Sequence, residues 1–512
     1  MLMKIVLIST STYPSDQGLR TISGCLKREG HKVKIIFLPM AEDYTLRYSS
    51  KVLNHLAQLC SNAKLIGVSA YASTSVRAEQ VIEHLKDLKI PIAYGGPHAT
   101  ISPDKCIEVT DIVGRGECED AMVELVSRID KGKDYFDVPN FWFRKKGKVI
   151  KNDIGKMPDC LDCFEHPDYD LENHYILEKG KLIRFLERHL NGMIFFMTTR
   201  GCPNACTYCS NHLYRQLYRG KGKLLRRYSV NYVIKELKRL KSRFKTIGFF
   251  DIRDETLLAR PLEEIKEFAD RYKKEVGMRF KCLADPTTMD YDKLKLLVDA
   301  GLTDIIIGIQ SGSNRVNLEV YKRYIKRSQV VDAAKVVNKF KNLAVMYDMI
   351  TTNPYEEKED VLDSIKVLME IPKPYYLSVN NLVFFLGTPL YEQAMKDGVI
   401  KTKKDSAFDL NYWDRWKHIK LKKKNAYLNL VLNLMRGSVS KSRYGLLPAP
   451  VLKFLIKDKV VDFNLKHTSL TYIVGTCVQV MDYFREHVAK PIYRNTLPTS
   501  FKVWYDRVRY KV

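Results

Sequence analysis

The stretch TRGCPNACTYC at residues 199–209 places three cysteines, Cys202, Cys206 and Cys209, in a CxxxCxxC spacing. Cysteine thiolates are the usual ligands of 4Fe-4S clusters, which need four iron ligands. Three thiolates from one short loop, with no obvious fourth partner, leave one iron atom open. The spacing therefore predicts an iron–sulfur site whose open iron binds a substrate or a cofactor.

A zinc site is the alternative interpretation, because short cysteine clusters also bind zinc, although such sites usually show two CxxC halves. Cys160 and Cys163 form a CxxC upstream of the trio. Spacing alone therefore leaves a four-thiolate zinc site or a second cluster open. We expect Cys160 and Cys163 to be structural or incidental thiols rather than ligands.

The composition is that of a large globular protein. A chain of 512 residues is long enough for about two to four domains, and its 45% hydrophobic content allows a sizeable core. Eleven cysteines, odd in number and unevenly spread, do not resemble a disulfide framework, and an oxygen-sensitive cluster needs a reducing interior. We therefore expect a cytoplasmic protein. The apolar run 470–480 is shorter than the roughly 20 residues of a membrane-spanning helix, so none is predicted.

Positive charge is concentrated near the C-terminus. The net charge is +26, and residues 401–512 hold 23 Lys/Arg against 8 Asp/Glu. Such a region fits an anionic membrane surface, nucleic acid or a phosphorylated substrate, and equally a solvated basic face. A helical cap, a lipid or membrane surface and, less favoured, an RNA surface are the three alternatives. They depend on apolar and aromatic residues among the lysines: 427–435, 446–456, Trp413, Trp416 and Trp504.

The chain up to residue 130 alternates short apolar runs with helical patterns, which predicts parallel β/α units in a doubly wound sheet. Ligands lie beyond the carboxyl ends of such strands, so the loops after Ile8, Ser69 and Gly95 should share one face. The expected strands are 4–8, 33–38, 65–69, 92–95 and 111–113, and the expected helices are 19–29, 52–61 and 75–88.

The same rhythm resumes at residue 191 after a structured linker at 131–190, and it predicts a partial (β/α)6 barrel up to residue 400. A basic, mostly helical region would complete the α/β chain at 401–512. The cysteine loop follows the first of these strands directly, which places it at the carboxyl rim. The expected strands are 194–198, 246–251, 278–283, 304–309, 344–350 and 377–383.

The cysteine loop resembles that of the radical S-adenosylmethionine (radical SAM) superfamily, in which an aromatic residue, here Tyr208, precedes the third cysteine. The resemblance implies that the amino and carboxylate groups of S-adenosylmethionine chelate the open iron, and that electron transfer cleaves this cofactor to a 5′-deoxyadenosyl radical. The phrase at 249–257 resembles a second-strand segment whose acids, here Asp254 or Glu255, lie near the amino end of S-adenosylmethionine. Gln310 and Ser311 lie in a phrase that resembles the family's fourth-strand segment. That segment usually has a glutamate where Gln310 stands, and the resemblance implies that it binds the ribose of S-adenosylmethionine.

Residues 3–130 are similar to the cobalamin-binding domains joined to radical SAM enzymes. Ser69 takes the place of the family's serine after the third strand, and the Gly95-Gly96 loop continues into His98. Glycines at a strand end let the backbone approach a bulky ligand. The Asp-x-His-x-x-Gly segment that supplies a cobalt ligand in many cobalamin proteins is not met, because glycine follows Asp16-Gln17. His98 is equally explained as a loop histidine bound by backbone groups, and a vestigial domain without cofactor is the alternative.

The resemblance implies a cobalamin-dependent radical SAM enzyme that methylates an unactivated carbon of a small-molecule, lipid or peptide substrate. A flavodoxin or ferredoxin would supply electrons, and peripheral contact with an anionic membrane is one role of the basic region. The alternatives are a radical cyclase, rearrangement or carbon–carbon joining enzyme, and a non-enzymatic cobalamin-binding module. A transfer RNA methylthiotransferase is disfavoured, because Cys25, Cys60 and Cys106 lack the contexts of a second cluster.

Overall fold

The computed structural model describes residues 2–14, 16–40, 46–401, 425–469, 471, 473 and 475–477. These residues form two compact units. The first holds residues up to 255 with 274–278 and 383–401, and the second holds 256–273, 279–382 and the described residues from 425 onward.

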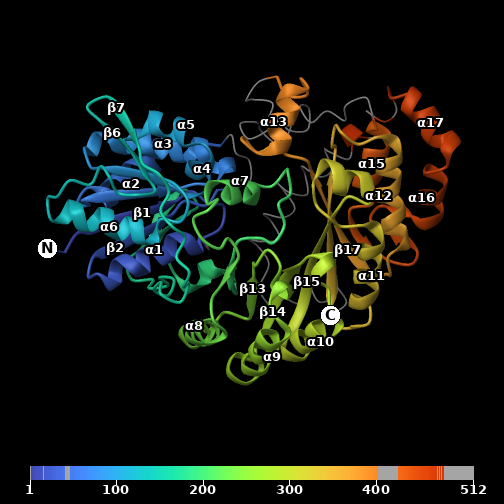
Figure 1. Cartoon of the computed structure of the whole chain (residues 1–512), viewed down its shortest axis with the longest axis horizontal. Helices are drawn as coiled ribbons and strands as arrows, with labels where there is room; N and C mark the ends of the chain where they lie inside the picture. The colour runs from blue at the N-terminus through green and yellow to red at the C-terminus, as the bar shows by residue number, and fades with distance from the viewer. Residues whose placement is uncertain are drawn as a thin grey trace. The chain divides into compact units, whose positions relative to one another are not determined.

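A nine-stranded sheet forms the N-terminal part of the first unit, in the order β7-β6-β5-β4-β3-β1-β2-β8-β9 (Figure 1). The pairs β5–β6, β6–β7 and β8–β9 are antiparallel, and the other neighbours are parallel. The strands are β1 (Lys4–Ser9), β2 (Lys32–Phe37), β3 (Leu65–Ser69), β4 (Ile92–Gly95), β5 (Ile112–Gly114), β6 (Phe141–Lys145), β7 (Lys148–Lys151), β8 (His174–Glu178) and β9 (Lys181–Arg184).

The doubly wound order is confirmed, with its switch point between β1 and β3. Helices α1 and α6 contact each other, whereas α2 and α3 pack together in a separate core with alternate residues of β1 and β3. This alternation leaves Leu7 and Gly67 to face α1 and α6. The helices are α1 (Gln17–Arg28), α2 (Ser50–Cys60), α3 (Ser75–Leu85), α4 (Gly96–Ile101), α5 (Pro103–Val109) and α6 (Glu119–Asp130).

The five expected N-terminal strands are present within a residue or two, but residues 131–190 do more than link. They add β6, β7, β8 and β9 to the sheet. These strands form two hairpins, β6–β7 and β8–β9. Each hairpin turns on a Lys-Gly pair with positive φ at both residues: Lys146 and Gly147 in the first, Lys179 and Gly180 in the second. Such two-residue turns match the twist of antiparallel strands. The domain boundaries at residues 130, 190 and 400 stay predictions.

The first unit continues into the region that carries the cysteine trio. Strand β10 pairs with β13 in parallel, and β11 pairs with β12 antiparallel. The cysteine loop lies between β11 and α7. These elements are β10 (Met193–Phe196), β11 (Thr199–Arg200), α7 (Ser210–Leu217), β12 (Arg226–Arg227), α8 (Val230–Arg243), β13 (Phe249–Ile252) and α13 (Pro389–Lys396).

The second unit holds the strand order β14-β15-β16-β17-β18-β19-β20. With β10 and β13, strands β14 to β17 confirm the six strands expected for a partial (β/α)6 barrel. Its elements are β14 (Arg279–Ala284), β15 (Leu302–Gln310), β16 (Ala344–Thr351), β17 (Tyr375–Asn381), β18 (Gly437–Val439), β19 (Arg443–Tyr444), β20 (Leu447–Pro448), α9 (Leu262–Arg271), α10 (Tyr291–Ala300), α11 (Arg327–Val337), α12 (Lys358–Glu370), α15 (Ala426–Leu434), α16 (Ala449–Leu455) and α17 (Asp458–Lys466).

The described part of the basic region packs onto the second unit. Helix α15 contacts α12 and α17, and β18 continues the sheet beside β17. This arrangement agrees with a helical cap for residues 425–466. Trp413, Trp416, Trp504 and most of the run 470–480 lie outside the described residues. Within the part of the chain that the structure describes, no helix is long and apolar enough to cross a membrane.

Candidate functional site

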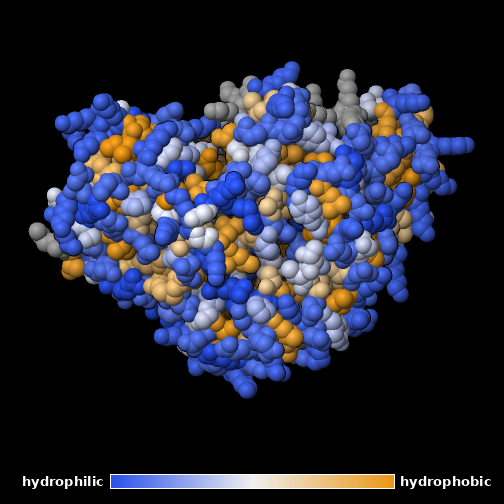
Figure 2. Space-filling view, viewed as in Figure 1, coloured by the Kyte–Doolittle hydropathy of each residue, from blue (hydrophilic) through white to orange (hydrophobic). Residues whose placement is uncertain are grey.

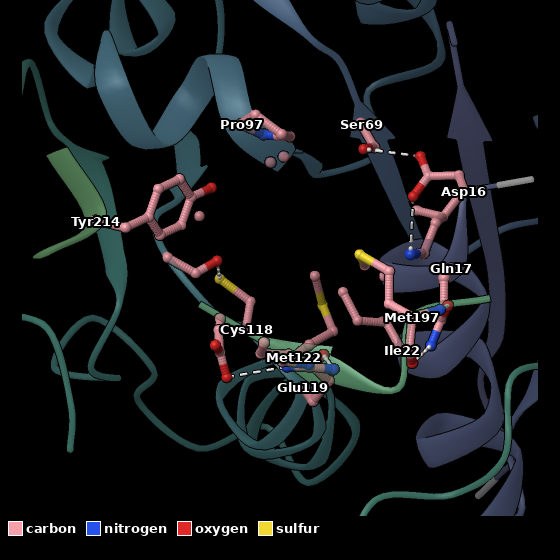
Figure 3. A pocket seen from close by; sticks show the side chains of 18 of the residues that line it. Asp16, Gln17, Ile22, Ser69, Pro97, Cys118, Glu119, Met122, Met197 and Tyr214 are labelled. Atoms are coloured by element: carbon pink, nitrogen blue, oxygen red, sulfur yellow. Dashed lines mark hydrogen bonds and ion pairs between the residues drawn. The ribbon is translucent and has the colours of Figure 1, made fainter. Parts of the chain in front are cut away.

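A cavity of about 310 Å³ opens at the carboxyl ends of β3 and β4 (Figure 3). Ser69, Gly95 and Gly96 line it from the sheet, and Cys202 and Glu255 line it from the region of the cysteine trio. All five residues belong to the first unit. The loops expected to bind cobalamin therefore share one cavity with a cysteine expected to bind the cluster.

The cavity extends between the sheet and helices α1 and α6, along a row of small residues. Gly67 and Ala93 are in register on β3 and β4, and Gly114 ends β5. All three line the cavity opposite Ile22 of α1 and Met122 of α6. An apolar slot on this face fits the flat nucleotide tail of cobalamin, because small side chains leave room for an aromatic ring.

The Gly95-Gly96 loop provides the close approach that a large ring system needs. Gly96 has φ +89°, and a Cβ there would lie 2.8 Å from Ser69 Oγ and 2.9 Å from the Ala70 carbonyl oxygen. A Cβ at Gly95 would meet no atom within 4 Å. Gly96 is therefore required by the backbone, and Gly95 faces open space. Both observations fit cobalamin bound at this edge.

Asp16 stands at the rim where many cobalamin proteins carry the Asp-x-His segment. Its Oδ1 accepts a hydrogen bond from the Leu19 amide at 3.2 Å, which caps α1, and its Oδ2 accepts from Ser9 at 3.1 Å and Ser69 at 3.3 Å. The negative charge of Asp16 raises the pKa of Tyr71, and the burial of the Tyr71 hydroxyl acts in the same direction. Tyr71 also lines the cavity. Asp16 thus joins three loops around the cofactor site, although this segment offers no histidine to cobalt.

The three cysteines follow β11 on a single loop. Cys206 is buried, and Cys202 and Cys209 are partly exposed. Burial raises the pKa of Cys202 to about 12 and that of Cys209 to about 11, and the nearby Glu255 carboxylate acts in the same direction. Among the described residues, no three His, Cys, Asp or Glu side chains stand as a site for one metal ion. In a 4Fe-4S cluster the cysteine thiolates bind different iron atoms.

Asp254 and Glu255 have different surroundings. Asp254 is buried, and its carboxylate accepts hydrogen bonds from the Thr198 amide at 2.5 Å, the Thr199 amide at 2.9 Å and the Thr198 hydroxyl. It therefore holds the strand that leads into the cysteine loop. Glu255 opens onto the cavity, and desolvation raises its pKa. Of the two acids, Glu255 is the one available to an ammonium group in the cavity.

Arg200 connects the cysteine loop to the loop after β5. Its guanidinium donates to Glu117 Oε2 at 2.9 Å and to Glu119 Oε1 at 2.6 Å. Arg226 also pairs with Glu117. Both glutamates line the cavity. Sequence reasoning did not select these glutamates, although the arginine before the cysteines and the Glu-Cys-Glu run at 117–119 were visible.

Gln17 makes a second connection of this kind. Its Oε1 accepts from the Met197 amide at 2.7 Å, and its Nε2 donates to the Met197 carbonyl at 3.2 Å. Figure 3 shows the sulfur atoms of Met197, Met122 and Cys118 pointing into the cavity, which makes its floor apolar. These residues also were not predicted, since no motif marks them in the sequence.

Seven predicted site residues do not line this cavity: Cys206, Cys209 and Asp254, described above, and Tyr208, His98, Gln310 and Ser311. Tyr208 lies on the cysteine loop, and His98 is buried in α4 beside Tyr94, with no hydrogen-bond partner for either ring nitrogen. Gln310 ends β15 with φ +66°, and Ser311 is fully buried against Ser364. Since Gln310 and Ser311 belong to the second unit, their cofactor roles, like that of His98, stay predictions.

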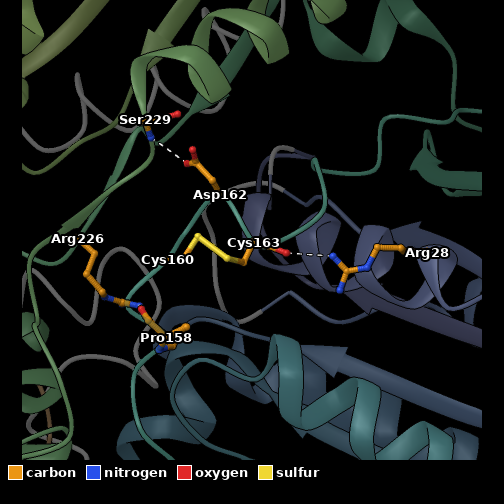
Figure 4. The surroundings of a disulfide bond; sticks show 7 residues. All are labelled: Arg28, Pro158, Cys160, Asp162, Cys163, Arg226 and Ser229. Carbon is orange, nitrogen blue, oxygen red and sulfur yellow. Dashed lines mark hydrogen bonds between the residues drawn. A yellow bond between two sulfur atoms is a disulfide. The ribbon is translucent and has the colours of Figure 1, made fainter.

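The remaining cysteines do not form a second cluster site within the described chain. Cys160 and Cys163 are joined in a disulfide rather than standing as two thiols (Figure 4). Their Cα atoms are 5.6 Å apart, within the range of a disulfide. Cys25, Cys60 and Cys106 are each buried on a different helix.

Two family models match parts of this chain. The Radical SAM superfamily matches residues 196–368, and the B12 binding domain matches residues 3–126. An uncharacterised methyltransferase of Pyrococcus horikoshii is 27% identical over 422 residues, which cover 78% of this chain and 85% of the relative. Cytidylyl-2-hydroxyethylphosphonate methyltransferase of Streptomyces wedmorensis is 26% identical, covering 61% of this chain and 64% of the relative.

The fold is also that of a solved enzyme. The radical S-adenosylmethionine methyltransferase TsrM from Kitasatospora setae superposes with a TM-score of 0.63, at 14% identity over 77% of this chain and 76% of TsrM. Radical SAM chemistry requires a 4Fe-4S cluster, S-adenosylmethionine and a reductant, and the B12 domain adds cobalamin. The chain belongs to the radical SAM enzymes that carry an N-terminal cobalamin-binding domain.

Proposed function

We propose that this enzyme methylates an unactivated carbon atom. The observation that carries the proposal is the shared cavity, which is lined by Ser69, Gly95 and Gly96 on one side and by Cys202 and Glu255 on the other. When bound, the cluster and S-adenosylmethionine supply a carbon radical, and cobalamin supplies the methyl group. A reaction that uses both needs them to face one substrate.

The residues of the cavity bind and orient the reactants. Cys202, Cys206 and Cys209 would hold three irons, and Glu255 would accept hydrogen bonds from the ammonium group of S-adenosylmethionine. Ser69, Gly95 and Gly96 would hold cobalamin at the sheet edge. Apolar side chains around the cavity exclude water, which protects a radical from quenching.

The test uses the reconstituted chain without its substrate. We expect reduced enzyme to convert S-adenosylmethionine into 5′-deoxyadenosine and, with cobalamin bound, into S-adenosylhomocysteine. Chromatography with mass detection measures both products. Cys202→Ala should abolish 5′-deoxyadenosine, because one cluster ligand is lost. Ser440→Ala, on an exposed turn of the second unit, is the matched control and should change neither product.

The two products separate the proposed reaction from its alternatives. Formation of both supports methyl transfer. Formation of 5′-deoxyadenosine alone, with cobalamin bound, would contradict the methyltransferase and favour a radical cyclisation or rearrangement. Formation of neither by an enzyme with a full cluster would contradict the radical assignment itself.

For the substrate, we propose a lipid that is presented at an anionic membrane surface. The support is the outer face of α16 and α17, where Val451, Phe454 and Phe463 are 42%, 55% and 62% exposed. Lysines interleave with them at positions 453, 457, 459 and 466. Exposed aromatic side chains among lysines are typical of helices that lie on anionic membranes.

Vesicle sedimentation tests this substrate class separately from the chemistry. The whole enzyme should sediment with phosphatidylglycerol vesicles and much less with phosphatidylcholine vesicles. Phe454→Asp with Phe463→Asp should release it, whereas Leu2→Asp, at an exposed leucine of the first unit, should not. Equal sedimentation of both variants would contradict a membrane role for α16 and α17.

A further inference from the structure

Cationic side chains surround the outside of the cysteine loop, and we propose that they form a docking surface for an acidic protein that donates single electrons. The inference rests on the proposed function, since only a redox-active cluster needs such a donor. Residues 188–235 contain nine Lys/Arg and no Asp/Glu. Six of the nine fall in residues 215–227, which we name the basic segment.

The basic segment touches the strand and loop of the cysteines at three places. Arg215, on α7, donates from Nη2 to the carbonyl oxygens of Cys202 at 3.1 Å and Pro203 at 3.2 Å. The carbonyl oxygen of Leu224 would lie 2.3 Å from a Cβ on Gly201, so the two backbones are in direct contact. Arg227 is in register with Thr199. The segment therefore borders Cys202 on both sides.

The loop has an inner and an outer side. Cys202 lines the cavity, whereas Pro203 is exposed to solvent together with Arg215. A protein that reduces the cluster therefore meets the loop at Pro203 and Arg215, because the cavity is reserved for cofactors. Figure 2 shows hydrophilic residues over the part of this face where Figure 1 places α7.

Some charges of the basic segment are already neutralised and others are free for a partner. Lys221 pairs with Asp153, and Arg226 pairs with Glu117. Arg219 and Lys223 are exposed and form no ion pair with any residue in the described ranges. Unpaired cations beside a redox centre attract an acidic partner, and this attraction raises the rate of encounter.

Electron transfer needs only a short-lived complex, which small, charged surfaces provide. One electron leaves the reduced flavin of the donor, and the oxidised cluster takes it up. No bond forms or breaks in this chain, and no proton moves. Docking at the basic segment leaves the donor close to the cluster loop without entering the cavity.

The test compares two charge reversals that change the net charge equally. Arg219→Glu with Lys223→Glu alters the docking surface. Lys32→Glu with Lys64→Glu is the control, because these exposed lysines lie at the amino ends of β2 and β3, opposite to the cavity. Stopped-flow absorbance follows the oxidation of reduced flavodoxin by each reconstituted holoenzyme, and dithionite serves as a small reductant for comparison.

We expect the docking variant to react with flavodoxin about tenfold more slowly than the wild type at low salt, with the difference vanishing at high salt. The control variant should keep the wild-type rate, and all proteins should react alike with dithionite. Equal rates for both variants would overturn the proposal, as would an equal loss with dithionite, which would indicate a damaged cluster. Unchanged flavodoxin rates with loss of RNA binding would assign the surface to nucleic acid.

The failure of the proposed function gives a different result. A wild-type chain that holds no cluster reducible by dithionite refutes the radical chemistry and the docking together. A cluster that dithionite reduces, and that flavodoxin reduces equally in wild type and docking variant, refutes the docking alone.

Discussion

Replacing Arg200 by methionine tests how the two sides of the cavity are held together. The guanidinium bridges Glu117 and Glu119, whose side chains are 16% and 5% exposed. Removing one partner of a buried ion pair costs about 3–5 kcal/mol, since a buried charge is left unpaired. Glu117 keeps Arg226, so the loss falls mainly on Glu119. We therefore expect a loss of local stability at the lower end of this range, about 3 kcal/mol, which corresponds to roughly a hundredfold change in the equilibrium constant for local opening.

Hydrogen–deuterium exchange with mass spectrometry measures this effect locally. Protection of peptides covering 197–206 and 114–122 should fall together by up to a hundredfold in Arg200→Met, because the ion pairs join these two segments. In the double variant Arg200→Met with Glu119→Gln, part of the lost protection should be restored, because the buried side chain at 119 is then uncharged. Arg188→Met removes an exposed pair with Glu178 and is the control, with an expected cost of about 0–1 kcal/mol. Unchanged exchange in both peptides, or a change in only one, would refute the reasoning.

Three further changes test single parts of the site. Asp254→Asn should lower the iron content after reconstitution, since it weakens the hydrogen bonds to Thr198 and Thr199, whereas Glu255→Gln should keep the iron and weaken S-adenosylmethionine binding about tenfold in equilibrium dialysis. Gly96→Ala should reduce cobalamin binding by at least about tenfold, because the φ of Gly96 is positive and the added Cβ would meet Ser69. Gly132→Ala is the control, since Gly132 also has a positive φ but a Cβ there would meet no atom. Equal losses of cobalamin binding in both variants would contradict the role of Gly96 in the cofactor site. Burial lowers the pKa of His98 to about 4, so the free energy of unfolding should fall as the pH drops from 6.5 to 4. His98→Phe should remove up to about 3 kcal/mol of this fall. If the thermal midpoint of His98→Phe depended on pH in the same way as that of the wild type, the prediction would be contradicted.

Much of the architecture could be predicted because its signals are local. The five N-terminal strands and six central strands are short apolar runs with loops at their carboxyl ends. Ser69, Gly95, Gly96 and Cys202 come from such loops, and the parallel topology brings them to one edge. The cavity that they share follows from this rule together with the strand order.

The connections between these loops could not be predicted, because they join residues far apart in the chain. The ion pairs of Arg200 cross 81 and 83 positions, and the Gln17 amide reaches Met197 across 180. Nothing in the local sequence distinguishes Asp254, bound by backbone amides, from its neighbour Glu255, which opens to the cavity. The strands of residues 131–190 were predicted as a linker, although their two Lys-Gly turns carried the hairpin signal.

Electron paramagnetic resonance of one sample tests the central claim, that cluster and cobalamin occupy the same cavity. The chain is reconstituted anaerobically with iron, sulfide and hydroxocobalamin, freed of unbound cofactor, and partly reduced so that both centres are paramagnetic. We predict about four irons and one cobalamin per chain, with the two signals broadened by mutual magnetic coupling. Four irons without cobalamin, or two signals that show no coupling, would contradict the account.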